Sequence, residues 1–428
     1  MSNVKLILIL AAVALLPGCV QLTLAWADLK PNGDQAAPAV LSAFNGEGPV
    51  STLAEWEGAR APALREVFQN EVYGHFPDDY ALNVVSRRVL DDAAFNGAGR
   101  LVEYELQAEA AFDGVRKKTD AFYMDVVLPA GKPNAPIILM QTFCPRWDTL
   151  PHPAVHRPEG AAGCGAGPLT GVMTYVFGRY IATPPTEMIL KRGYGVATIF
   201  PSEFAPDRRE EGLAALAAMS EGMATDRERW GAIAAWAWGY SLMVDALEQD
   251  EEIAAAQYVT WGHSRYGKSA LVAAAYDDRI DGVIAHQSGT GGASLNRNKK
   301  GESVKAITDS YPHWFARRYG DYAGREEEMP VDQHHLLALI APRPVLLGNA
   351  RRDVWSDPNG AFRAALGADP VYELYGNGGV EQDRLDQWNP AAALSFWIRP
   401  GTHGVVKEDW PAFLEFLDAH FQKDAVQG

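Results

Sequence analysis

The spacing of apolar residues in the first part of the chain predicts a helix followed by three strands. Residues 59–74 carry apolar side chains at helical intervals. The runs 82–90, 101–109 and 121–128 have the composition and length of strands. Residues 28–57 show neither pattern, and we expect them to form a loosely structured lead-in.

Beyond residue 130 the pattern changes to short apolar runs that alternate with helical segments. Buried strands are expected at 136–142, 195–200, 258–261, 282–286, 344–349 and 394–398. Helices are expected at 186–192, 227–248, 267–276 and 410–421. This alternation predicts an α/β protein with a mainly parallel central sheet and helices on both faces. Ligands of such sheets bind beyond the carboxyl ends of the strands, so the loops after the strands are where chemistry is sought.

The N-terminus has the pattern of an export signal. Residues 6–16 are almost wholly apolar and follow a single lysine, but the run is too short to cross a bilayer as a helix. Ala25-Trp26-Ala27 fits a signal peptidase site, whereas Leu16-Pro17-Gly18-Cys19 resembles a lipoprotein box in which Cys19 would be lipidated.

These two endings leave two expectations open. Residues 1–27 are a signal peptide, or a lipoprotein signal ends before Cys19, and residues 28–428 form a single catalytic domain with an N-terminal extension. In both cases we expect a periplasmic or secreted protein, with an outer-membrane lipid anchor in the second.

Composition excludes one class of partner and leaves one bond undecided. The net charge of −16 argues against nucleic acid, whose phosphates require a basic surface. Of three cysteines, Cys144 and Cys164 remain after export and could pair in an oxidising compartment, but sequence does not fix their geometry. We found no Cys/His cluster of the kind that binds a metal, and no metal is expected.

Ser264 stands where a short apolar strand meets a helix of small residues, in the sequence GHSRYGK. This is the setting of a nucleophile elbow, in which a sharp turn exposes the serine hydroxyl above the sheet. The usual second glycine is displaced, because residue 266 is tyrosine and glycine follows at 267. The alternative is a serine that merely caps an ordinary helix.

The order of residues along the chain favours the nucleophile. A hydrolase of this type has its acid and then its histidine in loops after later strands. Asp353 follows the run PVLLGNA, and His403 follows LSFWI within RPGTHG. We therefore expect His403 to accept the proton of Ser264 and Asp353 to stabilise the charged imidazole. Asp357, which precedes a proline, suits a turn better than a catalytic loop.

Four segments in this order resemble a known family: GHSRYGKSA, HQSGTGGASL, DQHHLLALIAPRPVLLGNARRDVWSDPNG and RPGTHG. They are similar to the glucuronoyl esterases of carbohydrate esterase family 15, within the α/β-hydrolase superfamily. The resemblance implies a three-layer α/β-hydrolase sandwich and a serine esterase without metal or organic cofactor. It implies hydrolysis of polysaccharide-linked uronate esters, between glucuronic acid on xylan and lignin alcohols.

The resemblance also assigns roles to residues around the serine. Ser264 matches the nucleophile and His403 the general base. The other matches are Arg265 with an oxyanion-hole arginine, Lys268 and Glu302 with residues that bind sugar hydroxyls, and Trp355 with a tryptophan that lines the sugar pocket. The residues alone leave other interpretations open, namely a solvated lysine, a surface salt bridge at Arg265 and core packing of Trp355.

One position departs from the family pattern. Many members carry a glutamate, which serves as triad acid, where this chain has Gln287 in HQSGTGG. An amide cannot carry the charge that stabilises an imidazolium, so the acid is expected at Asp353, as in other, chiefly bacterial, members. We place Gln287 among the substrate-binding residues.

Two other functions use the same fold. The first is a different carbohydrate esterase, such as an acetyl xylan esterase, which needs the same triad and differs only in substrate. The second is a non-catalytic carbohydrate-binding protein, against which the set Ser264, Asp353 and His403 argues.

Overall fold

The computed structural model describes residues 25–155, 157, 159, 163–164, 177–223, 229–253, 255 and 257–422. Most of the predicted signal segment and the first residues of the helix expected at 227–248 lie outside these ranges. Ala27 lies inside them, and its N–H donates to the carbonyl of Arg351 at 2.7 Å. None of the helices in the described ranges combines the length and apolarity that crossing a bilayer requires.

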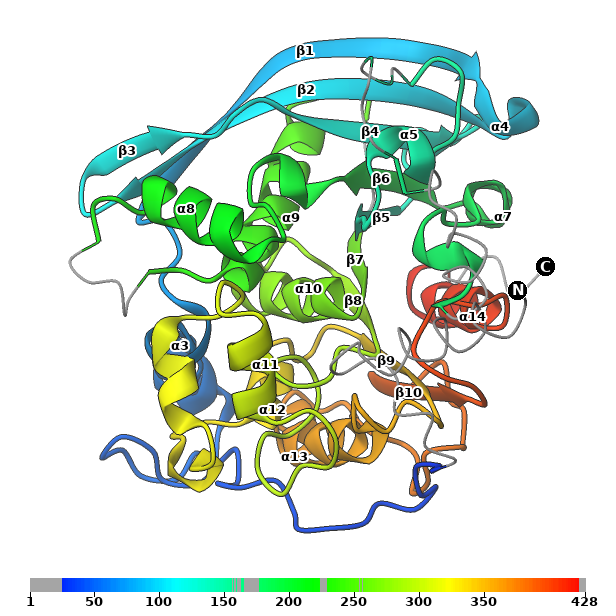
Figure 1. Ribbon diagram of the computed structural model, residues 1–428. Coiled ribbons are helices and arrows are strands. Elements are labelled where there is room, and N and C mark those ends of the chain that lie inside the picture. The colour runs from blue at the N-terminus through cyan, green and yellow to red at the C-terminus, as the bar shows by residue number, and fades with distance from the viewer. Residues whose placement is uncertain are drawn as a thin grey trace, which may run out of the picture.

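A ten-stranded sheet runs through the molecule in the order β1-β2-β4-β6-β5-β7-β8-β9-β10, with β3 paired to β2 (Figure 1). The strands from β5 to β10 are parallel, and β1 to β4 are joined to them in antiparallel fashion through β6. The bounds are β1 Asp79–Ala93, β2 Gly99–Phe112, β3 Val115–Lys118, β4 Phe122–Pro129, β5 Ile137–Gln141, β6 Gly195–Ile199, β7 Tyr258–His263, β8 Gly282–His286, β9 Val345–Ala350 and β10 Leu394–Arg399. The mainly parallel sheet is confirmed, and the polar strand β3 was not predicted.

Helices cover both faces of the sheet, because both faces of its central strands are apolar. In β5, Ile137 and Leu139 belong to one buried cluster and Ile138 and Met140 to another. The first cluster packs under α9 (Ala232–Glu248), α10 (Arg265–Tyr276), α12 (Gln333–Ala338) and α13 (Pro358–Leu374). The second packs under α7 (Thr186–Arg192) and α14 (Asp409–Phe421), across the sheet in Figure 1. The three-layer α/β-hydrolase arrangement is therefore confirmed.

Shorter helices complete the fold, and two of the longer helices, α8 (Arg209–Met219) and α13, were not predicted. The remaining α-helices are α2 Leu53–Glu55, α3 Ala61–Phe68, α4 Ala94–Gly97, α5 Arg146–Thr149, α8 Arg209–Met219 and α11 Val304–Ser310. Two π-helical turns, Trp56–Arg60 and Gln69–Tyr73, flank α3. Helix α13 escaped prediction because prolines and glycines interrupt its pattern, and tertiary packing holds it despite them.

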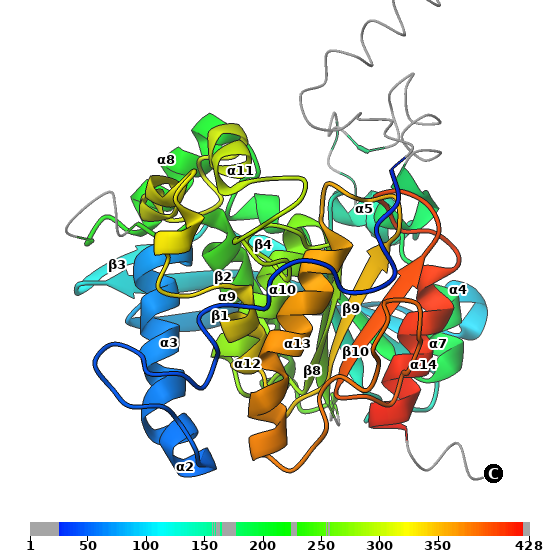
Figure 2. The same cartoon turned by 90° about the horizontal axis from the view of Figure 1, so that it is seen from below.

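The N-terminal segment packs on the catalytic domain. It crosses α13 on its way to α3 (Figure 2). Asn359 donates to the carbonyl of Lys30 at 2.8 Å, and Arg363 donates to that of Asp34 at 2.8 Å. A side chain at Gly367 would approach Ala36 to 2.4 Å, so this crossing requires a glycine in α13. The expected loose lead-in is wrong for residues 53–57, where the helical region has already begun.

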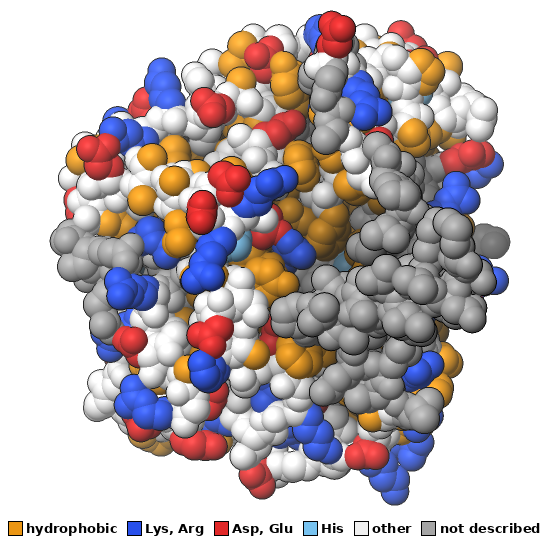
Figure 3. Space-filling model, in the orientation of Figure 1, with side chains coloured by type: hydrophobic (Ala, Val, Ile, Leu, Met, Phe, Trp, Pro, Cys, Tyr) orange, Lys and Arg blue, Asp and Glu red, His pale blue; other side chains and the backbone are white. Residues whose placement is uncertain are grey.

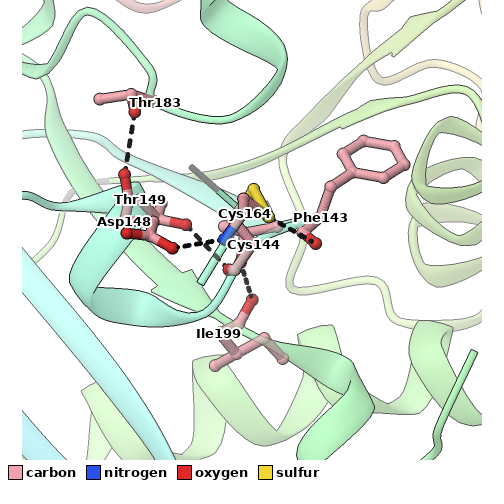
Figure 4. Close-up of a disulfide and its surroundings, with 8 residues drawn as sticks. Phe143, Cys144, Asp148, Thr149, Cys164, Thr183 and Ile199 are labelled. Carbon is pink, nitrogen blue, oxygen red and sulfur yellow. Dashed lines mark hydrogen bonds between the residues drawn. A yellow bond between two sulfur atoms is a disulfide. The ribbon is translucent and has the colours of Figure 1, made fainter. Parts of the chain in front are cut away.

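A disulfide joins Cys144 to Cys164, which decides the pairing that the sequence left open (Figure 4). It fastens the loop that leaves the carboxyl end of β5. The carbonyl of Cys144 accepts the hydroxyls of Thr142 at 2.8 Å and Thr149 at 3.0 Å. The N–H of Cys164 donates to the Asp148 carboxylate at 2.6 Å. The loop is thus held by hydrogen bonds as well as by the covalent link.

Replacing both cysteines, Cys144→Ser with Cys164→Ser, is expected to lower the free energy of unfolding. The link spans 20 positions, and closing a loop of that size stabilises a fold by about 3 kcal/mol. Urea unfolding of the oxidised protein and the double variant measures the difference. A change below about 1 kcal/mol would mean that the hydrogen bonds alone hold this loop.

Candidate active site

Ser264 occupies a strained turn between β7 and α10. Its backbone has φ 56° and ψ −120°, a conformation that costs a non-glycine residue about 1–3 kcal/mol. Its N–H donates to the carbonyl of His286 at 2.8 Å, and its side chain makes no helix-capping hydrogen bond. The nucleophile elbow is therefore favoured over the helix cap.

Two glycines make this turn possible. A Cβ on Gly262 would lie 1.9 Å from the carbonyl oxygen of Tyr266, where no side chain fits. A Cβ on Gly267 would lie 3.0 Å from the carbonyl oxygen of Gly262. The close approach falls at residue 267, one position later than the usual motif has it, which explains why tyrosine is tolerated at 266.

Asp353 and His403 form the predicted pair. Nδ1 of His403 lies 2.8 Å from Oδ2 of Asp353, in the loops that follow β10 and β9. Asp353 is buried, which opposes its ionisation, yet His403 and the hydroxyl of Ser356 hold its pKa below the ordinary value. The carboxylate is thus charged at neutral pH and fixes the proton of His403 on Nδ1, so that Nε2 is the basic nitrogen.

Three neighbouring histidine rings, tilted against one another, lie beside the elbow. The ring centroid of His403 lies 4.6 Å from that of His263, the residue directly before Ser264. Nδ1 of His263 is 3.1 Å from Nδ1 of His286 on the neighbouring strand. Burial keeps the pKa of both His263 and His286 well below the ordinary value, so both are neutral. This support was not predicted from the sequence, although the two histidines are paired in the β7–β8 register.

His403 packs against His263, the chain neighbour of Ser264, which places the imidazole beside the elbow. The hydrogen bonds of the described residues do not include one between the serine hydroxyl and the imidazole, whose Nδ1 is bound to Asp353. Catalytic hydrogen bonds are often long in a free enzyme and tighten when substrate binds. The absence of this hydrogen bond among the described residues is therefore compatible with the predicted roles of Ser264 and His403.

Arg265 follows the nucleophile as the first residue of α10. Its guanidinium forms an ion pair with Asp207, with Cζ 5.4 Å from the ring centre of Phe143 and 5.1 Å from that of Trp314. The salt bridge predicted as the alternative is present, but it lies in a partly buried aromatic setting. The backbone N–H of Arg265 begins a helix, where amides have no intrahelical partner.

Lys268 differs from both interpretations offered by the sequence. The side chain is buried, with 3% of its surface exposed, and its ammonium donates to the carbonyls of Ser288 and Thr290, the latter at 2.7 Å. Burial lowers the pKa of Lys268 to about 8. Lys268 is therefore neither a solvated lysine nor an open sugar contact here; it fastens the loop after β8 to α10.

Glu302 and Trp355 lie together, as the sugar-binding prediction requires. The N–H of Glu302 donates to the carbonyl of Trp355 at 3.0 Å. Trp355 is 37% exposed, so its ring is available to a ligand and is not core packing. Histidine and hydrophobic side chains are visible in a hollow near the centre of the face that Figure 3 presents.

Gln287 is wrongly predicted as a substrate-binding residue. Only 1% of it is exposed, and its amide binds the backbone on both sides of His403, at Thr402 and Gly404. A buried amide with these partners has no group left at the surface for a sugar. The described residues also contain no group of three or more acidic, histidine or cysteine side chains placed to hold a metal ion.

Residues 223–376 match the family model described as glucuronyl esterase, fungi. The carbohydrate esterase MZ0003, from an unknown prokaryotic organism, is 34% identical over 388 residues, covering 87% of this chain and 86% of its own. The chain belongs to carbohydrate esterase family 15.

Solved structures of this family have the same fold. A promiscuous family 15 esterase from a marine bacterial metagenome superposes with a TM-score of 0.78 at 32% identity, over 91% of this chain and 98% of its own. The glucuronoyl esterase of Solibacter usitatus has a TM-score of 0.74 at 30% identity, over 92% and 99%. This family 15 chain is thus a carboxylic ester hydrolase with an α/β-hydrolase fold.

The Asp353→Asn variant is expected to fold and to lose most of its activity. The amide can hold His403 but cannot stabilise its charged form, and comparable changes in serine hydrolases lower kcat by about 10⁴-fold. Steady-state kinetics on a uronate ester, with the melting temperature as the control for folding, measures the loss. A variant with kcat within about threefold of the parent would assign the acid elsewhere.

Proposed function

We propose that this protein hydrolyses glucuronoyl esters, which join glucuronic acid on xylan to lignin alcohols, through an acyl-enzyme on Ser264. The observation that carries the proposal is the Asp353–His403 pair, whose imidazole packs against His263, the residue directly before Ser264. Relatives named glucuronoyl esterase or 4-O-methyl-glucuronoyl methylesterase support the substrate class.

In the first half of the reaction, Nε2 of His403 removes the proton of Ser264 and Oγ attacks the ester carbonyl carbon. The carbonyl electrons move onto oxygen, and Asp353 stabilises the imidazolium that has formed. The intermediate then collapses, the bond to the alcohol oxygen breaks, and His403 returns its proton to that oxygen. The alcohol leaves and the uronoyl group remains on the serine.

In the second half a water molecule replaces the alcohol. His403 takes a proton from the water, whose oxygen attacks the acyl carbon, and a second tetrahedral intermediate forms. Its collapse breaks the bond to Oγ, and the proton on His403 returns to Ser264. The uronic acid is then released. In the net reaction the alcohol has gained one proton and the uronic acid the hydroxyl of the water.

The negative oxygen is expected to meet backbone amides. The N–H of Arg265 is the first donor, since it lies directly after the nucleophile at the start of α10. A second donor in this fold comes from the loop after the strand next to the nucleophile strand, here the segment after β5. In that segment the N–H of Thr142 is already bound to Ile199 at 3.1 Å, which leaves Phe143 as the first amide to consider.

The sugar is expected on the side of Trp355 and Glu302. The exposed indole offers a flat apolar surface to a sugar ring, and the carboxylate offers hydrogen-bond acceptors to its hydroxyls. Lys268 supports the loop that carries Glu302: its ammonium holds the carbonyl of Thr290, and the Thr290 hydroxyl donates to the Glu302 carbonyl at 2.5 Å.

We also propose that the protein acts outside the cytoplasm. The apolar segment at residues 6–16 and the Cys144–Cys164 disulfide support export to an oxidising compartment. Lipid attachment at Cys19 is the alternative to simple cleavage after Ala27. Mass spectrometry of the N-terminal peptide from the exporting host distinguishes the two forms.

Ser264→Ala and His403→Ala are each expected to lower the hydrolysis of methyl or benzyl glucuronate by at least about 10³-fold, because each removes a partner of the proton transfer. Release of the alcohol measures the rate, and far-ultraviolet circular dichroism checks the fold. Retention of activity by either variant would contradict the mechanism. A parental enzyme that cleaves acetyl xylan in preference to the uronate would contradict the substrate class and favour an acetyl esterase.

A further inference from the structure

Gln287 is the first residue after β8, and its backbone is fixed there. Its φ is 50°, in the left-handed region that side-chain-bearing residues rarely adopt. Its N–H donates to the carbonyl of Gly348 in β9 at 2.7 Å. The residue before it, His286, receives the N–H of Ser264. The backbone of Gln287 is therefore fixed directly after His286, whose carbonyl binds the N–H of Ser264.

The Gln287 side chain holds the loop that carries His403 from both sides. Nε2 donates to the carbonyl of Thr402 at 3.2 Å, and Oε1 accepts the N–H of Gly404 at 2.8 Å. The two partners are the immediate neighbours of His403 in the chain. One buried side chain thus fixes the peptide groups on each side of the catalytic imidazole.

An amide supplies both of the hydrogen-bonding groups that this position uses. A glutamine donates through nitrogen and accepts through oxygen, whereas an ionised carboxylate only accepts. A carboxylate at residue 287 would place a negative oxygen against the carbonyl of Thr402. It would also face Arg399, which donates to Thr402 at 3.3 Å and to Gly404 at 2.7 Å, and which pairs with Asp409 at 2.8 Å.

The surrounding charges already balance without an acid at residue 287. Asp409 is fully buried, and its Oδ1 lies 2.8 Å from Nε of Arg399 and 3.5 Å from Nε2 of His286. Asp353 supplies the charge that His403 needs. A second carboxylate beside Arg399 would compete with Asp409 for the guanidinium and would move the loop that Arg399 holds.

We infer that Gln287 is a positioning residue, whose amide clamps the backbone on both sides of His403 and so sets the imidazole between Asp353 and Ser264. The inference rests on the proposed role of the triad. Charge and position are supplied by different side chains here: Asp353 provides the charge at Nδ1, and Gln287 provides the placement of the loop. Gln287 touches neither the substrate nor the reacting atoms.

The test compares Gln287→Glu with Gln333→Glu. Gln333 is the matched control, because it is also a fully buried glutamine that donates through Nε2, to Tyr73 at 3.1 Å and Gly292 at 2.6 Å, without contacting the triad. Both variants bury a carboxylate in place of a bonded amide. Their melting temperatures measure what that burial does to the fold.

Gln287→Glu is expected to lower kcat by about 10–100-fold with KM within about threefold, since displacement of a catalytic group by about 1 Å can cost 10² in rate. Gln333→Glu is expected to keep the parental kcat at temperatures below its melting point. Equal kcat values for Gln287→Glu and the parent enzyme would overturn the inference. If Gln287→Glu does not fold, Gln287→Met, which is neutral and of similar size, is expected to show the same loss of kcat.

A double variant separates the clamp from an alternative acid. In the Asp353→Asn background, Gln287→Glu is expected to give no recovery of activity. Recovery would mean that a carboxylate at residue 287 serves the imidazole directly, and it would overturn the clamp. The low-field proton resonance of the His403–Asp353 hydrogen bond gives a second measurement, and the clamp predicts that it shifts or broadens in Gln287→Met and stays unchanged in Gln333→Glu.

A fluorophosphonate labels Ser264 without any uronate substrate. The labelling rate therefore tests the clamp independently of the proposed substrate class. If the parent does not cleave the uronate but is labelled, the substrate class fails, and the variants are then compared by labelling rate alone. If Ser264→Ala removes no labelling, the triad itself fails and the clamp fails with it. A Gln287→Glu variant that is labelled as fast as the parent overturns the clamp while leaving the triad intact.

Discussion

The active site depends on the register of four parallel strands. In β7, β8, β9 and β10 neighbouring residues are paired without offset near their carboxyl ends, with His263 opposite His286 and His286 opposite Gly348. Because parallel strands end at one edge of a sheet, the loops that follow them converge there. Ser264, Gln287, Asp353 and His403 each belong to one of these four loops. A slip of one residue in any pair would turn the next side chain to the other face.

Within this frame, two different constraints hold His403 in place. Asp353 acts on the ring, through a short hydrogen bond that also selects the tautomer. Gln287 and Arg399 act on the backbone of the loop, through bonds to the residues on either side of the ring. The neutral histidines behind the ring fill the remaining space without adding charge. In this site the side chain that pairs with the ring, Asp353, and the side chain that binds the loop backbone, Gln287, are therefore separate.

The disulfide and the N-terminal segment show how the rest of the fold serves this edge. Cys144 belongs to the loop beside the elbow, and Phe143 before it packs its ring 4.8 Å from that of Tyr266 in α10. The covalent link therefore restrains a loop in contact with the nucleophile helix. The segment around Lys30 is bound to the start of α13, which follows the loop that carries Asp353. Both restraints act next to catalytic loops.

The sequence by itself predicted the mainly parallel sheet, most of its strands, the sharp turn at Ser264 and the two loops in which Asp353 and His403 pair. These features follow from local patterns, namely apolar runs, glycine positions and polar residues after strands. Such patterns can be recognised without knowing which residues are in contact in the folded protein. It also revealed the missing glutamate at residue 287, but it misjudged what the glutamine does. The backbone partners of Lys268 were also not predicted. In a sequence, a polar residue near a site is equally consistent with a side chain that binds a ligand and with one that binds backbone groups.

Only the tertiary structure decided those partners. Four contacts join residues that are separated in the sequence. They are the bonds from Lys268 to carbonyls, the bonds from Gln287 to peptide groups, the packing of three histidine rings and the Cys144–Cys164 disulfide. Local pattern encodes whether a residue is apolar and which element it belongs to. Whether a buried polar group faces a ligand or a backbone carbonyl depends on how the elements pack, because every buried donor must find an acceptor wherever the fold places one.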